Sequence, residues 1–314
     1  MELIEVTTTP AQDQTPITLV IGKFDGVHRG HVQLLQNALQ HKQGKLAVMS
    51  FSDHPRWILR GEDEYRQHLT PLQHKLVLLE SMGVEKFYHI NFTKEFSAIT
   101  AEQFVQQHLA ALNVQRLVIG ADFRLGKDGS ANAETLSKLC GDIGIIVDVI
   151  PLLQATTEKI SSTSIRHFLK NGQIEAANEQ LGRKYAVWGE VIHGNALGRT
   201  LGFPTINLGG MAHDYVPPKP GVYIGRVEVT TENNKKEQLP ALISAGFRPT
   251  VDGKHYLIEG YILNFSGNLY GQQVAIYFEQ LVRNELKFEN LDDLIAQMEL
   301  DRQHAEHYFH RVLQ

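Results

Sequence analysis

Short apolar runs alternate with longer amphipathic runs over the first 150 residues. Five of the apolar runs have the length and character of buried parallel strands, at residues 17–22, 46–51, 86–90, 116–120 and 144–150. Between them, apolar residues recur at helical spacing in four segments, at residues 31–42, 71–82, 101–112 and 132–140. This alternation predicts a Rossmann-like, doubly wound α/β layer. Sheets of this kind bind ligands at the carboxyl ends of their strands.

The pattern changes near residue 183. Shorter runs with a period of two, separated by Gly and Pro, follow at residues 184–194, 221–231, 238–247, 256–265 and 272–282. They predict a small antiparallel β-barrel. Residues 290–313 have helical periodicity, and Asn290 is suited to cap that terminal helix. We therefore expect two domains, at residues 1–182 and 183–314, with two short helices within residues 163–182.

Composition narrows the function. A chain of 314 residues with 42% hydrophobic residues is long enough for two domain cores. Its formal net charge of −5 excludes broad attraction to nucleic acid or acidic membranes, and no apolar run approaches the roughly 20 residues of a membrane helix. The one cysteine, Cys140, predicts a cytoplasmic location, and the first residues do not resemble a signal peptide. We expect a monomer or weak homo-oligomer that acts on small molecules.

One motif lies at a predicted strand end, at residues 21–31, IGKFDGVHRGH. Gly22, Gly26 and Gly30 permit close backbone approach by a ligand, and the start of the following helix favours phosphate. His28 and His31 are close enough along the helix to donate hydrogen bonds to one phosphate. The spacing matches neither a Walker loop nor a Gly-x-Gly-x-x-Gly turn. On these residues alone, an ordinary glycine-rich turn with two surface histidines fits equally well.

A second motif is the segment 160–172, ISSTSIRHFLKNG. Four hydroxyl residues precede a helical run that ends at Asn171 and Gly172. Capping of the helix by Ser161 or Ser162 is one explanation. A phosphate pocket formed by these hydroxyls and Arg166 is the other, and both stay open.

Together these motifs resemble the histidine-signature nucleotidyltransferases. More narrowly, the chain resembles the bacterial bifunctional riboflavin kinase/FMN adenylyltransferases, also called FAD synthetases. Its Pro204-Thr205-Ile206-Asn207 stretch is similar to the heart of the flavokinase loop. Further similar blocks follow in order along nearly the whole chain, at residues 50–55, 69–75, 91–104, 120–129, 193–208, 219–225, 244–253, 256–271 and 281–301. The chain departs from the family at Leu125, where an aromatic residue is usual, and at Asn264, where Asp is common.

The resemblance implies that the first domain is an FMN adenylyltransferase, in which the FMN phosphate attacks the α-phosphorus of ATP. The protein then supplies alignment and charge stabilisation. His28 and His31 would be catalytic. The residues implied for ATP are Gly22, Phe24, Asp25, Gly30, Ser161, Ser162, Thr163 and Arg166. Those implied for FMN are Asp122, Phe123 and Arg124, although Asp122 also fits an ordinary turn.

The resemblance implies that the second domain is a flavokinase-like barrel that phosphorylates riboflavin. Glu259 would be the general base, and Thr205 and Asn207 would bind Mg²⁺. Strand alternation points these last two side chains to one face, and their hard oxygen atoms suit that ion. Contacts with ATP or flavin are implied for Gly194, Gly198, Gly202, Pro204 and Arg283. Without the resemblance, Glu259 would be read as a solvent-facing strand residue and Arg283 as a surface charge.

Two other functions remain in view. One is a nucleotidyltransferase that acts on another phosphorylated acceptor, but the Pro-Thr-Ile-Asn half argues against it. The other is a non-catalytic flavin-binding protein. The expected substrates and products of the main hypothesis are riboflavin, FMN, FAD and ATP, with Mg²⁺ as the metal. Nucleic-acid binding is disfavoured because no basic stripe with interleaved aromatic residues is present.

Overall fold

The chain divides into two compact units, Met1–Ser162 and Thr163–Gln314. The computed structural model describes residues 1–155, 158–194, 198, 201–231, 233–250 and 253–312. Across these ranges, no helix has both the length and the apolar character needed to cross a bilayer. The second unit includes residues 163–182, which the sequence assigned to the first domain.

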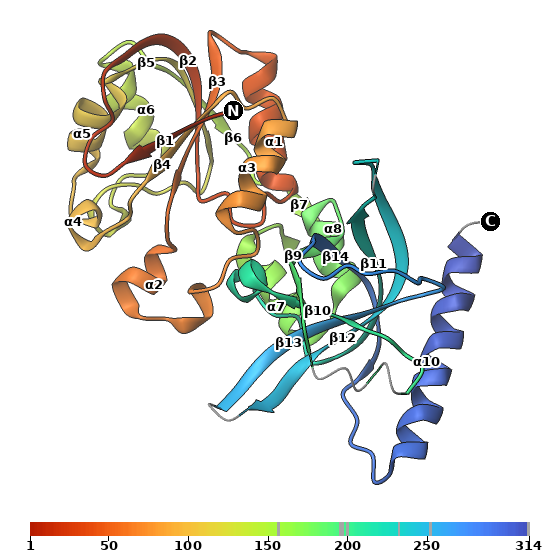
Figure 1. The fold of residues 1–314 in the computed structure, drawn as a ribbon. Helices are drawn as coiled ribbons and strands as arrows, with labels where there is room; N and C mark the ends of the chain where they lie inside the picture. The colour runs from red at the N-terminus through yellow and green to blue at the C-terminus, as the bar shows by residue number, and fades with distance from the viewer. Residues whose placement is uncertain (156–157, 195–197, 199–200, 232, 251–252, 313–314) are drawn as a thin grey trace. The chain divides into compact units, whose positions relative to one another are not determined.

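The first unit is built on a six-stranded parallel sheet with the strand order β1-β4-β3-β2-β5-β6 (Figure 1). Its strands are β1 (Glu2–Val6), β2 (Asp13–Ile21), β3 (Lys45–Phe51), β4 (Lys86–Ile90), β5 (Leu112–Gly120) and β6 (Ile146–Ile150). A small antiparallel pair follows, formed by β7 (Gln154–Ala155) and β8 (Glu158–Lys159). The predicted doubly wound layer is confirmed.

Helices cover both faces of this sheet (Figure 1). On one face, α1 (Arg29–Gln40) and α3 (Leu72–Ser81) bury Leu35 and Leu79 against Val20 and Val48. On the other face lie α5 (Ala101–Phe104), the π-helix η2 (Val105–Leu109) and α6 (Ala133–Gly141). The remaining helices are α2 (Pro55–Arg60), η1 (Asp63–Tyr65), α4 (Lys94–Ser97) and η3 (Lys127–Gly129). Two separate apolar cores therefore sandwich the sheet.

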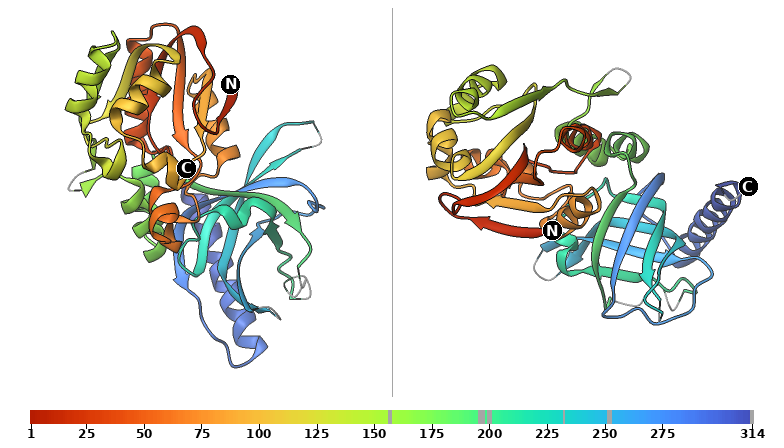
Figure 2. Two further views of the ribbon diagram at one scale, coloured as in Figure 1. Left: turned by 90° about the vertical axis from the view of Figure 1, so that its left-hand side faces the viewer. Right: turned by 90° about the horizontal axis from the view of Figure 1, so that it is seen from above.

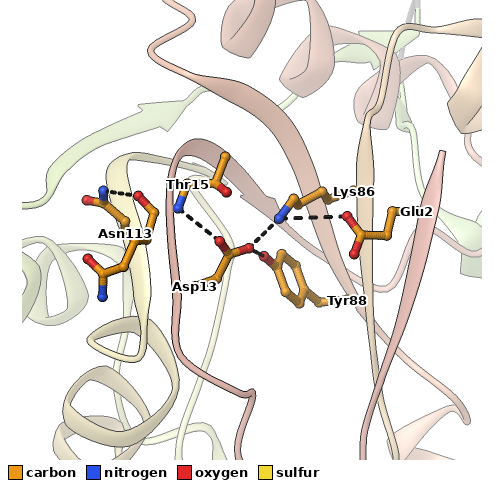
Figure 3. Close-up of polar contacts among 7 residues, drawn as sticks. Glu2, Asp13, Thr15, Lys86, Tyr88 and Asn113 are labelled. Atoms are coloured by element: carbon orange, nitrogen blue, oxygen red, sulfur yellow. Dashed lines mark hydrogen bonds and ion pairs between the residues drawn. The ribbon is translucent and has the colours of Figure 1, made fainter.

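A polar cluster joins three strands at the amino edge of the sheet (Figure 3). Asp13 accepts a hydrogen bond from Lys86, a buried residue, and another from the Tyr88 hydroxyl at 3.3 Å. Lys86 also lies 3.7 Å from a Glu2 carboxylate oxygen. The hydrogen bond from Lys86 holds the pKa of Asp13 well below its usual range. Because Glu2, Asp13 and Lys86 each begin a strand, the cluster stabilises the edge opposite the predicted ligand site.

The second unit contains a closed six-stranded barrel with the order β10-β13-β12-β11-β14-β9 (Figure 2). All six of its pairings are antiparallel. Its strands are β9 (Tyr185–Ile192), β10 (Ile206–Gly209), β11 (Gly221–Thr230), β12 (Lys236–Thr250), β13 (Gly253–Ile262) and β14 (Gln273–Asn284). Among the described residues, the named helices of this part of the chain are α7 (Ser162–Asn171), α8 (Ile174–Leu181), η4 (Gly210–Asp214) and α10 (Leu291–Val312). The predicted barrel with a terminal helix is confirmed.

The terminal helix α10 packs on the outside of the barrel. Ala305 and Phe309 join a buried cluster with Ile224 and Leu242. Asn290 caps the helix, because its side-chain oxygen accepts a hydrogen bond from the Asp293 amide at 2.9 Å. The predicted cap is therefore confirmed.

Four strands were not predicted as such, and two of them, β7 and β8, have only two residues each. β1 is a five-residue edge strand with two exposed glutamates, so it lacks the apolar run that marked its neighbours. β10 has four residues, fewer than a periodicity needs to be recognised. The predicted helix at residues 101–112 ends earlier, and Leu112 begins β5. In each case the neighbouring strand decides the conformation, because it supplies the hydrogen-bonding partners.

Candidate active sites

The loop 22–28 joins the carboxyl end of β2 to the start of α1. Phe24 and Val27 have positive φ angles of 49° and 40°, and Gly26 has a φ of 89°. A left-handed conformation costs a non-glycine residue about 1–3 kcal/mol, so the surrounding structure must hold the loop in place. Phe24 and Val27 are fully buried in the core between the sheet and α1, which supplies part of that stabilisation.

The two histidines of the motif are stacked at the start of α1. Their ring centroids lie 3.7 Å apart, and the His31 ring also stacks on Phe24 at 4.7 Å. The backbone N–H of His28 donates to His31 Nδ1 at 3.3 Å. We therefore assign the proton of a neutral His31 to Nε2, which becomes the donor atom of the ring. A Cβ at Gly30 would lie 3.2 Å from the His28 ring, so glycine suits the stacking.

The loop is held by donors from distant parts of the first unit. The hydroxyl of Ser50, at the end of β3, donates to the Lys23 carbonyl at 2.8 Å. The amide of Leu69 donates to Asp25 Oδ1 at 2.8 Å. The Ser162 hydroxyl donates to the Asp25 carbonyl at 2.7 Å. Ser162, a residue of the second motif, thus contacts the first motif within the first unit, which capping alone would not have required.

Ser162 is the first residue of α7, and the other residues of the second motif divide between the units. Ser161 is half-buried in the first unit. Thr163 is exposed and Arg166 is buried, and both belong to the second unit. Gly22 lies within the loop region itself, where a Cβ would be 3.3 Å from the Phe24 ring.

The segment predicted for FMN follows β5 at the same carboxyl edge. Asp122 and Arg124 are exposed, whereas Phe123 packs against the core formed by β2, β5 and α6. Asp122 forms an ion pair with Lys159 in β8, and both side chains are about half exposed. Lys159 was missed in the sequence, although it directly precedes the second motif. Leu125, where the chain departs from the family, is a core residue, because its side chain is only 7% exposed.

In the second unit, the barrel aligns two of the predicted kinase residues. Asn207 of β10 is paired directly with Glu259 of β13, and Glu259 is paired with Ser244 of β12. Directly opposite residues share a face, with Cβ atoms about 4.5–5.5 Å apart. Thr205 lies two residues before Asn207, at the entrance to β10. An amide, a hydroxyl and a carboxylate are therefore grouped at one end of two neighbouring strands.

The predicted glycines lie close to these residues. A Cβ at Gly194 would lie 2.5 Å from Asn207 Nδ2, a distance that only glycine permits. The Gly198 carbonyl accepts from the Phe203 amide at 2.8 Å, and Gly202 has a φ of 86°. Residues 195–197 and 199–200 of the predicted loop lie outside the described residues. Within the described part of the loop, the backbone of Gly194 therefore lies directly against the Asn207 side chain.

A cavity of about 530 Å³, within the usual range for small-molecule sites, is lined by Ile206 and Gly260, the strand neighbours of Asn207 and Glu259, while Asn207 and Glu259 are not among its lining residues. Pro204 and Thr205 line it, together with the loop between β13 and β14. In that loop, the Tyr270 ring stacks on His193 with centroids 3.8 Å apart. Sequence reasoning missed Asn268 and Tyr270, although both lie in a block that resembled the family.

Arg283, to which the resemblance assigns a ligand contact, forms an ion pair with Asp301. Its Nε lies 3.0 Å from Asp301 Oδ2 and its Nη2 lies 2.7 Å from the same oxygen. Gln297 donates to the other oxygen of Asp301 at 2.9 Å. Asp301 is 4% exposed, so this is a buried charge-assisted pair between β14 and α10. The guanidinium of Arg283 thus attaches the terminal helix to the barrel.

Comparison with known proteins agrees with both halves of this description. Residues 10–164 match the family model of FAD synthetase, and residues 181–309 match that of riboflavin kinase. The bifunctional riboflavin kinase/FMN adenylyltransferase of Listeria monocytogenes is 37% identical over 298 residues, or 94% of this chain and 93% of that protein. The protein of that name from Bacillus subtilis is 36% identical over 305 residues, or 95% and 94% of the two chains.

One solved structure also matches over the whole length. It comes from Streptococcus pneumoniae, is called a macrolide-efflux protein, and has a TM-score of 0.84 and 30% identity. The match covers 98% of this chain and 99% of that one. The resemblance in the motifs is thus confirmed by nearly full-length relatives. The chain belongs to the family of bifunctional riboflavin kinases/FMN adenylyltransferases.

Proposed function

We propose that this protein phosphorylates riboflavin to FMN and then adenylylates FMN to FAD, consuming one ATP in each step. The observation that carries the proposal is that one chain holds two separate phosphate-handling arrangements. One is the strained loop 22–28 with its stacked histidines, and the other is the Asn207–Glu259 pair, against which Gly194 lies closely.

In the adenylyltransferase, a phosphate oxygen of FMN attacks the α-phosphorus of ATP, and the bond to pyrophosphate breaks. FMN supplies the nucleophile, so the protein needs only to align the phosphates and stabilise charge. His31 Nε2–H and His28 donate to the phosphate oxygens, and the backbone amides of the loop and Gly30 approach closely. Asp25 holds the loop, while Ser161, Ser162, Thr163 and Arg166 bind the leaving pyrophosphate. Asp122, Phe123 and Arg124 contact FMN.

In the kinase, the terminal hydroxyl oxygen of the riboflavin side chain attacks the γ-phosphorus of ATP, and ADP leaves. Glu259 accepts the hydroxyl proton, which makes it the general base. Its pairing with Asn207 supports this role, because the acceptor of the proton and the phosphate-binding group must lie within a few ångströms. Gly194, Gly198, Gly202 and Pro204 close over the nucleotide. We assign Arg283 to the flavin-binding part of the kinase, where its ion pair with Asp301 attaches α10 to the barrel.

The donor set of the kinase site suits Mg²⁺. Thr205 and Asn207 offer neutral oxygen atoms, and Glu259 adds a nearby carboxylate. Mg²⁺ prefers hard oxygen ligands and shares its coordination with phosphates and water, so two protein ligands suffice. When bound there, Mg²⁺ would neutralise the charge of the β- and γ-phosphates. We assign the adenylyltransferase to residues 1–182 and the kinase to residues 183–314, and we place the enzyme in the cytoplasm.

The test is to incubate the purified chain with riboflavin, ATP and Mg²⁺ and to separate the products by chromatography. The wild type should form FMN first and FAD later. His31→Ala should abolish FAD formation and leave FMN formation intact. Asn207→Ala should stop FMN formation while added FMN is still converted to FAD. Equal loss of both activities in either variant would show that the sites are not separate.

The two alternatives predict other outcomes. A nucleotidyltransferase for another acceptor would release pyrophosphate with that acceptor and not with FMN. A non-catalytic flavin carrier would purify with a yellow ligand that is never turned over. The pairing of Asn207 with Glu259 disfavours both, because neither alternative needs a base beside a phosphate-binding amide.

A further inference from the structure

The carbonyl of Lys23, in the loop 22–28, receives two hydrogen bonds from outside the loop. Ser50 Oγ donates at 2.8 Å, and Lys75 Nζ donates at 3.4 Å. All peptide bonds described here are trans, so the C=O and N–H of one peptide lie in the same plane and point in opposite directions. The two donors therefore fix the direction of the Phe24 N–H, which faces away from Ser50 and Lys75.

Lys75 is an unusual residue for its position. It lies on α3 one turn before Leu79, on the face that packs against the sheet, and it is only 5% exposed. A lysine ammonium is rarely buried unless a specific contact offsets its lost hydration. Burial lowers the pKa of Lys75, and the Asp25 carboxylate in the same loop opposes that shift. The contacts of Lys75 thus converge on the loop.

We propose that Lys75 is a positioning residue of the adenylyltransferase, which acts with Ser50 on the Lys23 carbonyl to hold the backbone of the loop 22–28 in its phosphate-binding conformation. The inference rests on the proposed function of the first unit. The positive charge of Lys75 also offsets the carboxylate of Asp25, which would otherwise repel the phosphates. The Leu69 amide and Ser162 hydroxyl hold Asp25, so the loop is oriented at two successive points.

The test measures FAD formation from FMN and ATP, a reaction in which the kinase site takes no part. Lys75→Met should lower kcat/KM for ATP by about tenfold to a hundredfold, the usual effect of losing a charged hydrogen bond. Ser50→Ala should lower it about fivefold to tenfold, because one neutral donor is lost. Lys75→Arg keeps the charge and the donor and should recover at least part of the loss. Riboflavin phosphorylation should stay within twofold of wild type in all three variants.

A second readout separates positioning from simple destabilisation. Adenosine, AMP and ATP share the nucleoside and differ only in the number of phosphate groups. The inhibition constants of adenosine and AMP can therefore be compared with the KM for ATP. In Lys75→Met, the loss of affinity should increase from adenosine to AMP to ATP. A merely structural role would weaken all three equally. Ser50→Ala tests the same carbonyl independently if Lys75→Met does not fold.

Lys86→Met is the matched control. Lys86 is also a lysine of the first unit, 6% exposed, but it lies at the amino edge of the sheet. Its loss should lower the stability of the unit and leave the KM for ATP within twofold of wild type. If Lys75→Met keeps wild-type kinetics, or if Lys86→Met reproduces its phosphate-dependent loss, the inference is overturned. A wild-type chain that forms no FAD would instead contradict the proposed function.

Discussion

Replacing Gly194 with alanine should damage the kinase and spare the adenylyltransferase. The backbone of Gly194 has no positive φ, so alanine introduces a steric effect without backbone strain. Its Cβ would lie 2.5 Å from Asn207 Nδ2 and 2.7 Å from Asn207 Cγ. To reach an ordinary contact at 3.4 Å, one of the two groups must move by about 0.9 Å.

The size of the kinetic effect follows from that displacement. Moving a positioning group by about 1 Å costs on the order of a hundredfold in rate, or about 2.7 kcal/mol of transition-state stabilisation. We therefore expect kcat/KM for riboflavin phosphorylation to fall about a hundredfold in Gly194→Ala. FAD formation from added FMN should stay within twofold of wild type. Both rates are measured on one protein preparation by chromatography of the flavins.

Gly210→Ala serves as the control for backbone strain. Gly210 has a φ of 61°, and a Cβ there would meet no atom within 4 Å, so the substitution adds strain without a clash. It should lower stability by about 1 kcal/mol and leave kinase kcat/KM within threefold of wild type. Full kinase activity in Gly194→Ala would refute the argument that Asn207 must keep its position. A parallel loss of FAD formation would show that the damage is not confined to the barrel.

Two further predictions concern the base and the amino edge of the sheet. Glu259→Gln should lower kinase kcat by about a hundredfold to ten-thousandfold, because the amide cannot accept the hydroxyl proton, while FAD formation persists. Asp13→Asn should destabilise the first unit by about 2 kcal/mol at pH 7, less than for a fully buried pair because Asp13 is partly exposed and Glu2 remains near Lys86. The pKa of Asp13 is lowered in the folded state, so its contribution is present above the unfolded pKa and is lost as pH falls below about 4. The urea midpoints of wild type and variant, measured by the loss of FAD formation, should therefore converge as the pH falls below about 4. A difference between the two midpoints that stays constant with pH would contradict the stabilising role of Asp13.

The fold could be predicted largely because hydrophobic periodicity reports burial. Continuous apolar runs such as residues 46–51 belong to strands covered on both faces, and that is where they lie. The strand at residues 2–6 could not be recognised in this way, since it lies at the edge of the sheet and carries charges. Its conformation depends on pairing with β4, which is about 80 residues away in sequence.

Without the family resemblance, the sequence indicated candidate site residues only where they are neighbours in one short motif. His28 and His31 occur in one short motif, and the structure stacks them. The groups that hold the loop, Ser50 and Lys75, come from β3 and α3, and nothing local to them indicates a ligand site. Lys75 in particular looks like a solvent-facing residue of an amphipathic helix. Such contacts become visible only when the strands and helices are packed together.

The pairing of Asn207 with Glu259 also constrains how this gene can vary. Side chains of a strand alternate between the inside and the outside of a barrel, so inserting one residue between Pro204 and Asn207 would turn the amide to the opposite side. A duplication of two residues would restore the side but move the amide along the strand by nearly 7 Å. Neither change can be absorbed, because β10 is held by a partner strand on each side. Viable insertions and deletions in this part of the coding sequence should therefore fall upstream of the Pro204 codon.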